Sequence, residues 1–421
     1  MKKTIRLGIY GARRGGDLGR AALLANADVV AICDSAKDKL EERKTQFPDA
    51  TLYTEFDKFI EHDMDGVILA NFFHEHAPYA IRLLERGIHV LSECTSNSTM
   101  AEGVALVRAA EKSEAIYMLS ENYPYMKFNL EMKRICDGGT LGKILYAEGE
   151  YNHPGNGKNI RNKKYLNYFP EHWRNFLPRT YYVTHSLAPI MSATGAIPRR
   201  VTAFSCTSDE PIDNSIATAS HISPDVAAII MTKNDDGSVF KFTAHSSFGA
   251  HANSYRIAGK RGQIENLRGM GEKVMLRYNS WQIPEGREEI NLYEPSWHDE
   301  DSELIEKTGH GGGDYLVVRE FIRSITDGRK PDFDVYFATT MASVGILAHR
   351  SVLDGGKPYD IPDFRLEDDR RKWENDDLSP FWYSDGRAPT IPCCSINDYK
   401  PSDEQMRLFR EIVMEEKEKN K

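Results

Sequence analysis

The sequence lacks long apolar runs, paired cysteine spacing and an excess of positive charge. No stretch approaches the roughly 18 consecutive apolar residues of a spanning helix, so we expect no membrane partner. The six cysteines show no Cys-x-x-Cys or histidine-pair spacing, which argues against structural zinc and a disulfide framework. A net charge of -9 argues against nucleic acid as the main partner.

A chain of 421 residues exceeds the size at which one core keeps growing, so we expect more than one domain. The N-terminal sequence MKKTIRLGIYG starts with positive charge, but its short apolar run leads directly into a glycine turn. We interpret this run as the first strand of a cytoplasmic protein and not as a signal peptide.

Residues 4–34 read as strand, glycine turn, helix and strand. The turn, residues 11–19, contains four glycines, an Ala/Leu-rich helix is expected at 20–26, and Asp34 ends the second strand. Glycines allow a pyrophosphate to approach the backbone, a helix start offers N–H groups, and an acid about 20 residues later binds ribose hydroxyls. This order predicts a dinucleotide site that uses Gly11, Gly15 or Gly16, and Asp34.

The match to the Gly-x-Gly-x-x-Gly fingerprint is imperfect, because Arg13 replaces the middle glycine. The alternative is an ordinary parallel α/β unit with a glycine turn. Asp34 favours NAD, since a carboxylate repels the extra phosphate of NADP, although Arg13, Arg14 and Lys37 could still accept that phosphate. Arg13 and Arg14 are therefore further candidate cofactor contacts.

Strands and helices alternate as far as residue 122. A helix is expected at 127–137, and strands dominate afterwards, among them 255–265 and 274–278. This order predicts an α/β fold with two sheets: an N-terminal Rossmann-type, doubly wound parallel sheet, and a C-terminal α+β domain with an open, largely antiparallel sheet. We expect domains at 1–122 and 123–365, followed by a C-terminal arm and helix at 366–421. The region 361–399 is interpreted as an ordered wrap, and 406–417 as a charged helix.

Polar residues follow three successive strands of the first domain, where a ligand crevice is expected. The candidate cofactor contacts among them are Asn71, His76, Glu93 and Asn122. An N-cap or a satisfied polar turn is the alternative for each one alone. Glu75 lies between two histidines, but no third metal ligand has suitable spacing, so we predict no metal site.

The second domain contains Tyr182 and His185, three residues apart and on one face if a helix begins there. Histidine titrates near neutrality, and neighbouring positive charge can lower the pKa of tyrosine, so this pair could share acid–base work. A buried pair at the domain junction is the alternative. His310 and Asp314 surround a glycine turn, where they could face a ligand or cap the next helix.

With these residues in view, the chain resembles the glucose-fructose oxidoreductase / inositol dehydrogenase (Gfo/Idh/MocA) family. The resemblance rests on the glycine turn with Asp34, on GIHVLSE at 87–93, on LGKI at 141–144 and on GKRGQIE at 259–265. It implies an N-terminal Rossmann domain, an open C-terminal sheet that pairs subunits, and hydride exchange between NAD(P) and a sugar or cyclitol carbon.

Two departures from the family are visible. The usual Glu-Lys-Pro triplet is Glu93-Cys94-Thr95 here, and Tyr181 stands where an aspartate is common. The NAD-dependent glycosidases similar to α-N-acetylgalactosaminidases lack that lysine too, and YVTHSLAP at 182–189 and HGGGD at 310–314 look like their motifs. In that branch NAD oxidises C3 of the sugar transiently, which acidifies the C2 proton and releases the aglycone.

The resemblance implies Tyr182, His185 and Glu93 as catalytic residues. The candidate substrate contacts are Trp173, Arg174, Tyr181 and His310. Three functions stay open: an NAD-dependent sugar oxidoreductase, a glycosidase or lyase that uses the same hydride chemistry transiently, and an inactive NAD-binding sensor. The expected partners are a small carbohydrate and further copies of the chain in a homodimer or homotetramer.

Overall fold

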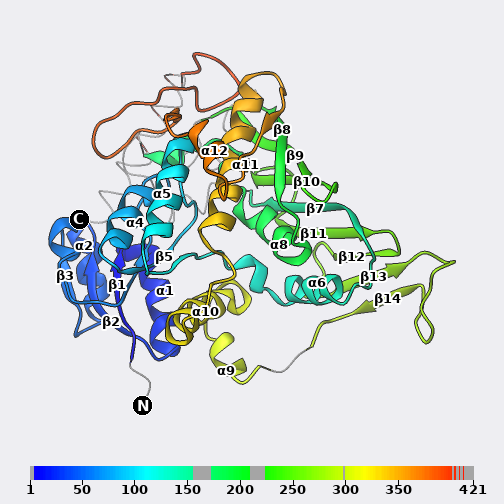
Figure 1. Cartoon of the computed structure of the whole chain (residues 1–421), viewed down its shortest axis with the longest axis horizontal. Coiled ribbons are helices and arrows are strands. Elements are labelled where there is room, and N and C mark those ends of the chain that lie inside the picture. Colours follow the sequence, from blue (N-terminus) through cyan, green and yellow to red (C-terminus); the bar gives the residue numbers. More distant parts are fainter. Residues whose placement is uncertain are drawn as a thin grey trace.

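The computed structural model describes residues 4–154, 172–208, 223–296 and 299–400, with positions 403, 407 and 411. Two sheets lie side by side, with helices between and around them (Figure 1). The N-terminal sheet is parallel and has the strand order β3-β2-β1-β4-β5-β6. Its strands are β1 (Arg6–Tyr10), β2 (Asp28–Cys33), β3 (Thr51–Tyr53), β4 (Gly66–Leu69), β5 (His89–Ser92) and β6 (Tyr117–Leu119). The predicted doubly wound parallel sheet is confirmed.

The helices of this sheet are α1 (Ala12–Leu24), α2 (Lys37–Lys44), α3 (Phe56–Phe59), α4 (His76–Glu85) and α5 (Met100–Lys112). The prediction of a long glycine turn before a helix at 20–26 is wrong, because α1 already begins at Ala12. Gly11 alone makes the turn, with φ of 98°. A Cβ on Gly15 or Gly19 would lie 2.5 or 2.6 Å from the Ile9 side chain, so both glycines serve close helix–strand packing.

The second sheet has nine strands in the order β14-β13-β12-β11-β7-β10-β9-β8-β15. They are β7 (Ile144–Asn152), β8 (Pro198–Thr207), β9 (Asp225–Asn234), β10 (Val239–Ser246), β11 (Ala252–Gly259), β12 (Gly262–Asn266), β13 (Val274–Tyr278), β14 (Ile290–Tyr293) and β15 (Tyr359–Asp360). All neighbours are antiparallel except β7 and β10, which confirms the largely antiparallel expectation. The predicted single strand at 255–265 is wrong: a turn at Lys260 and Arg261 divides it into β11 and β12.

Helices cover one face of the second sheet. The described helices that follow β6 are η1 (Tyr123–Tyr125), α6 (Lys127–Asp137), η2 (Trp173–Phe176), α8 (Thr184–Thr194), α9 (Ser302–Ile305), η3 (His310–Gly312), α10 (Gly313–Asp327), α11 (Val335–Leu353) and α12 (Glu367–Arg371). Helix α8 packs on β7, β10 and β11, while α11 contacts β8 and also α5 and β6 of the first sheet. Because α11 is buried along most of its length, it connects the two sheets through a shared core.

The expected boundary at 122/123 falls between β6 and α6, at η1. The described residues from 366 to 400 lie along the top of the molecule in the view of Figure 1. Most of the predicted helix at 406–417 lies outside the described residues. None of the described helices is both long and apolar enough to cross a membrane.

Candidate active site

The segments after β4, β5 and β6 meet at one edge of the first sheet, because neighbouring parallel strands end on the same side. Three buried polar atoms there have no protein partner among the described residues: Oδ1 of Asn71, Nε2 of His76 and Oδ1 of Asn122. Buried polar atoms are normally satisfied, so these three fit contacts with a ligand. Burial lowers the pKa of His76, and its Nδ1 lies 2.7 Å from the Thr95 carbonyl oxygen.

Gly11 and Asp34 occupy the places that a dinucleotide requires. A Cβ on Gly11 would lie 2.2 Å from the Ala70 carbonyl oxygen, so only glycine allows β1 to pass this close to the end of β4. The Asp34 carboxylate accepts hydrogen bonds from the N–H groups of Ala12 and Ala36 at 2.8 and 2.9 Å. A carboxylate accepts about four hydrogen bonds, so Asp34 retains capacity for ribose hydroxyls. These residues fit NAD.

Gly16 and Arg13 have contacts of their own. A Cβ on Gly16 would lie 2.2 Å from Nε of Arg43, whose guanidinium donates to the carbonyl oxygens of Ala12 and Arg13. Gly16 therefore admits the arginine that ties α2 to the start of α1. Arg13 lies close enough to His172 for its charge to contribute to the lowered pKa of that ring.

Arg14 joins the two domains through two carboxylates. Its Nε donates to Glu93 at 2.7 Å, and its Nη1 and Nη2 donate to the two oxygens of Asp314 at 2.9 and 2.7 Å. Asp314 also accepts from Asn122 at 2.7 Å and lies 3.1 Å from Nδ1 of His310. Burial by itself raises the pKa of Asp314, but Arg14 and His310 outweigh it and hold the pKa well below its ordinary value.

Tyr182, His185 and Glu121 form a hydrogen-bonded chain. Nδ1 of His185 lies 2.8 Å from Oε1 of Glu121, and Nε2 lies 3.2 Å from the Tyr182 hydroxyl. Since an ionised carboxylate only accepts, His185 donates through Nδ1 and accepts the Tyr182 O–H at Nε2. Burial alone raises the pKa of Glu121, but the His185 ring outweighs it and the pKa lies below its ordinary value.

Other groups fix the histidine ring. Tyr123 stacks on His185 with centroids 4.0 Å apart, and Tyr151 meets the ring edge-on at 4.9 Å. The Cys94 thiol donates to Oε2 of Glu121 at 3.1 Å. Neither Glu121 nor Tyr151 is among the site residues predicted from the sequence. The strand-end position was the one signal for Glu121, while Tyr151 is an ordinary inward residue of β7.

Burial raises the pKa of Tyr182 well above its ordinary value, and Tyr151, Cys94 and Glu93 raise it further, while Arg174 lowers it. The expectation that positive charge moves this tyrosine toward neutrality is wrong, because burial outweighs Arg174. Tyr182 therefore does not lose its proton to solvent. It can pass the proton to His185, as serine does in a Ser-His-Asp triad.

Phe73 and Trp173 form a stack of aromatic rings that begins at Tyr182. Phe73 stacks on Tyr182 at 5.4 Å and on Trp173 at 5.1 Å, and the Arg174 guanidinium lies 4.4 Å from the centre of the Trp173 ring. The His310 ring centroid lies 6.1 Å from that of Tyr123, the ring that stacks on His185.

Tyr181, the remaining candidate substrate contact, points elsewhere. Its ring packs against His349 and Phe381, and its hydroxyl donates to the Ser98 carbonyl oxygen at 3.3 Å. The structure therefore does not bring Tyr181 to the other candidate substrate contacts.

Glu75 and its neighbouring histidines have separate hydrogen-bond partners. The Glu75 carboxylate accepts from the N–H and hydroxyl of Ser384, and Nε2 of His74 lies 2.8 Å from the Trp382 carbonyl oxygen. The C-terminal wrap thus covers the strand-end loop. Within the described ranges, no three His, Cys, Asp or Glu side chains are arranged to hold a metal ion.

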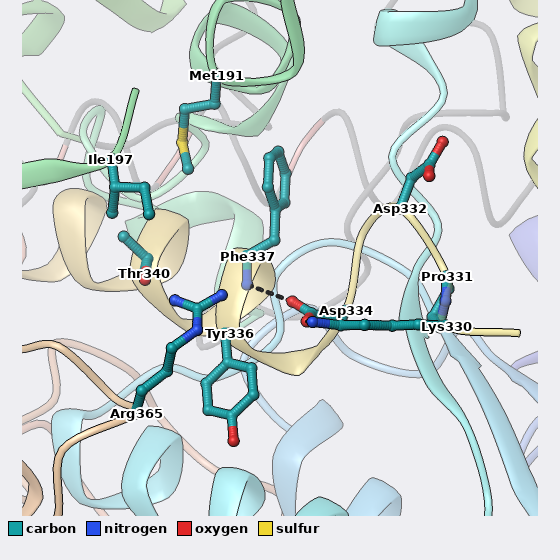
Figure 2. Close-up of a pocket in the computed structure, with 10 residues that line it drawn as sticks. All are labelled: Met191, Ile197, Lys330, Pro331, Asp332, Asp334, Tyr336, Phe337, Thr340 and Arg365. Carbon is teal, nitrogen blue, oxygen red and sulfur yellow. Dashed lines mark hydrogen bonds and ion pairs between the residues drawn. The ribbon is translucent and has the colours of Figure 1, made fainter. Parts of the chain in front are cut away.

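A separate cavity of about 320 Å³ lies at the start of α11 (Figure 2). It is lined by Met191, Ile197, Lys330, Pro331, Asp332, Asp334, Tyr336, Phe337, Thr340 and Arg365. None of the candidate site residues lines it. Asp334 accepts from the N–H of Phe337 at 2.9 Å, so this acid serves as the helix cap.

Two family models match consecutive parts of the chain. Residues 5–121 match the oxidoreductase family with an NAD-binding Rossmann fold, and residues 125–374 match the C-terminal domain of glycosyl hydrolase 109. A glycosyl hydrolase family 109 protein of Streptomyces niveus is 26% identical over 399 residues, covering 86% of this chain and 78% of the relative. One from Saccharopolyspora erythraea is 24% identical over 403 residues, covering 88% and 85%.

Solved structures share the fold. Levoglucosan dehydrogenase, in a complex with NADH and L-sorbose, superposes with a TM-score of 0.69 at 17% identity, covering 86% of this chain and all (100%) of that one. The myo-inositol 2-dehydrogenase of Lactobacillus plantarum gives 0.63 at 18% identity, covering 85% and 100%. The chain therefore belongs to the glycosyl hydrolase 109 family and carries the NAD-binding Rossmann domain of the Gfo/Idh/MocA oxidoreductases.

Proposed function

We propose that the protein is an NAD-dependent oxidoreductase that removes a hydride from a ring carbon of a sugar, with Tyr182 as the base. The hydrogen-bonded chain from Tyr182 through His185 to Glu121 carries this proposal. Bound NAD supplies a two-electron hydride acceptor. Gly11, Asp34, Asn71, His76, Glu93 and Asn122 would hold it, with Arg13 and Arg14 at the start of α1.

The protein's part in the reaction is to move one proton. A sugar hydroxyl gives its proton to the Tyr182 oxygen while the Tyr182 proton moves to Nε2 of His185. Glu121 stabilises the positive ring through Nδ1, and the stacked Tyr123 keeps the ring in this orientation. Because Tyr182 is partly buried, the transfer takes place in surroundings with little water, where such charge interactions are strengthened.

Glycoside cleavage with transient oxidation is the second candidate, favoured by the match of residues 125–374 to glycosyl hydrolase 109. There the same tyrosine removes the C2 proton of a 3-keto sugar. Glycosidases that use two carboxylates need them free on opposite sides of the bond. In this site Glu93 binds Arg14 and Glu121 binds His185, an arrangement that favours the redox route.

One experiment tests both candidates. The purified protein is incubated in deuterated water with free sugars and nitrophenyl glycosides, with and without added NAD+. Accumulating NADH with added NAD+ supports net oxidation, whereas nitrophenol release with deuterium at C2 supports glycoside cleavage. If the protein binds NAD and turns over no substrate in either assay, it is the inactive sensor and the proposal is wrong.

We further propose a homodimer or homotetramer formed through the uncovered face of the second sheet. This face exposes Phe204 by 61% and Leu292 by 54% near its two ends, with the Glu148–Lys241 pair between them. An open sheet face that no helix covers is a surface through which subunits can pair in a closed, symmetric assembly. Light scattering of the protein and of Phe204→Glu tests this part. A cytoplasmic location also belongs to the proposal, and cell fractionation tests it.

A further inference from the structure

Arg179 is a buried cation beside the proposed site. It is 3% exposed, its Nε donates to the Asp225 carbonyl oxygen at 2.7 Å, and its Nη1 donates to the His245 carbonyl oxygen at 3.4 Å. In the described part of the chain it forms no ion pair with a carboxylate. The Asp225 carboxylate instead accepts from the N–H and hydroxyl of Ser395.

Arg179 contacts His245, a residue that packs beside Tyr182 and Tyr151. Its Nη1 is 3.5 Å from Nδ1 of His245, and the His245 ring lies 5.8 Å from the Tyr182 ring and 5.6 Å from the Tyr151 ring. Burial lowers the pKa of Arg179 to about 10, although the Asp225 carboxylate acts to raise it, so the guanidinium is still charged at neutral pH. Arg179 thus feels the Asp225 carboxylate without a direct ion pair, and an anionic ligand group would further reduce the cost of burying its charge.

Arg174 is a second cation on the same side. It is held over Trp173, which stacks through Phe73 onto Tyr182. Like Arg179, it has no carboxylate partner among the residues that the structure describes. Its charge reaches the site, since it opposes the rise in the pKa of Tyr182 and contributes to the lowered pKa of His245.

The carboxylates near the site do not offset these two arginines. Glu93 and Asp314 share Arg14, and Glu121 is paired with His185. Two further histidines lie beyond His245. The His153 ring centroid is 6.4 Å from that of His245 and 4.8 Å from that of His251. Burial lowers the pKa values of His245 and His153, so these rings are neutral and add no negative charge that would offset the two arginines.

We propose that the sugar substrate carries an anionic substituent, a carboxylate or a sulfate, which Arg174 and Arg179 draw to the Tyr182 side of the site. The inference rests on the proposed carbohydrate function and specifies its substrate class. An anionic group supplies the counter-charge that a neutral sugar lacks. A charge-assisted hydrogen bond from Arg174 is about twice as strong as a neutral one, and the charge of the buried Arg179 attracts the same group from a distance, so acidic sugars should be favoured about 10- to 100-fold in kcat/KM.

The test uses matched substrates that differ only in the acid. Nitrophenyl glucuronide is compared with the glucoside, and a 6-sulfated glycoside with its unsulfated form, and the same sugars are tested free in the NADH assay. Preference for the uronide alone identifies a carboxylate, and preference for the sulfated sugar identifies a sulfate. Equal kcat/KM values for acidic and neutral members would overturn the inference and leave the proposed function standing.

Variants connect the preference to the two arginines. Arg174→Met should reduce the preference for the acidic sugar at least 10-fold through KM, and Arg174→Lys should restore part of it. Arg287→Met is the control, because Arg287 is an exposed arginine in the β13–β14 hairpin. Arg179→Gln is compared only if its circular dichroism spectrum matches the wild type. An unchanged preference in Arg174→Met and in a folded Arg179→Gln contradicts the inference.

A binding readout covers the case of no turnover. Glucuronate and glucose 6-sulfate are titrated calorimetrically against the NAD-loaded protein, with glucose as the neutral match. If the acids bind more tightly and Arg174→Met removes the difference, the inference holds although the proposed reaction has failed. If the acids bind no better than glucose, the inference fails on its own.

Discussion

Nδ1 of His185 lies 2.8 Å from Oε1 of Glu121, a carboxylate that is fully buried at the end of β6. The two residues are 64 positions apart: Glu121 follows β6 of the first sheet, and His185 lies on α8, which packs on the second sheet. This contact gives the ring its tautomer and leaves Nε2 to accept the Tyr182 proton. The arrangement has the logic of a catalytic triad with tyrosine in the place of serine.

Replacement of Tyr182 by phenylalanine should lower kcat about 100- to 10,000-fold, because general base catalysis contributes about that much. The ring packing on Phe73 is kept, so NAD affinity should stay at the wild-type value. Steady-state kinetics and NAD titration check both statements. Tyr181→Phe is the matched control, since its hydroxyl contacts the Ser98 carbonyl oxygen and not His185. Full turnover in Tyr182→Phe would show that another group is the base.

Glu121→Gln should reduce kcat about 100-fold while the fold remains intact. The amide keeps the shape of the side chain but no longer stabilises a positive His185 ring. Pre-steady-state kinetics should show the loss in the proton-transfer step, with little change in KM. Cys94→Ala, which removes only the second donor to Glu121, should have an effect of less than 10-fold. An effect in Glu121→Gln as small as in Cys94→Ala would contradict the triad.

Arg14→Met should lower the free energy of unfolding by about 3–5 kcal/mol, the usual effect of removing one partner of a buried ion pair. The change leaves Glu93 and Asp314, whose side chains are 15% and 5% exposed, without their cation. Urea unfolding at pH 7 measures the loss. Arg82→Met removes the exposed pair with Asp57 and should cost less than about 1 kcal/mol. Equal losses in the two variants would rule out the domain-joining role.

The stabilising effect of Asp314 should depend on pH. Its pKa is lower in the folded protein than in the unfolded chain, so its stabilising effect is complete above the unfolded value of about 3.9 and is lost as pH falls further. The gap in unfolding free energy between wild type and Asp314→Asn should therefore be constant from pH 7 to about 5 and should narrow below about 4. A gap that widens in acid would contradict this assignment.

Gly11→Ala should abolish NAD binding or folding. Its Cβ would lie 2.2 Å from the Ala70 carbonyl oxygen, and φ of 98° is strained for alanine. Gly87→Ala is the control, because Gly87 also has positive φ, 74°, but nothing within 4 Å of the added Cβ. The control should cost about 1 kcal/mol and bind NAD normally. Thermal unfolding and fluorescence titration with NADH measure the two effects.

The sequence by itself determined the two sheets and the nucleotide end of the first. Period-3.6 and alternating patterns predicted the helix at 127–137 and the strand at 274–278 with the bounds of α6 and β13. Asp34 after the second strand pointed to NAD. The sequence patterns did not reveal that α1 begins at Ala12, because glycines occur both in turns and in helices that pack closely on a strand.

Only the tertiary structure decided the chemistry around Tyr182. Glu121 comes 61 residues before Tyr182 in the sequence, so local spacing does not reveal that they share a histidine. Residues 181 and 182 are both tyrosines, so the sequence does not show which of them faces the site. In the structure the Tyr181 ring packs against Phe381 in the core, and the Tyr182 hydroxyl contacts His185. The raised pKa of Tyr182 likewise arises from burial among residues distant in the chain, which exists only once both sheets have packed.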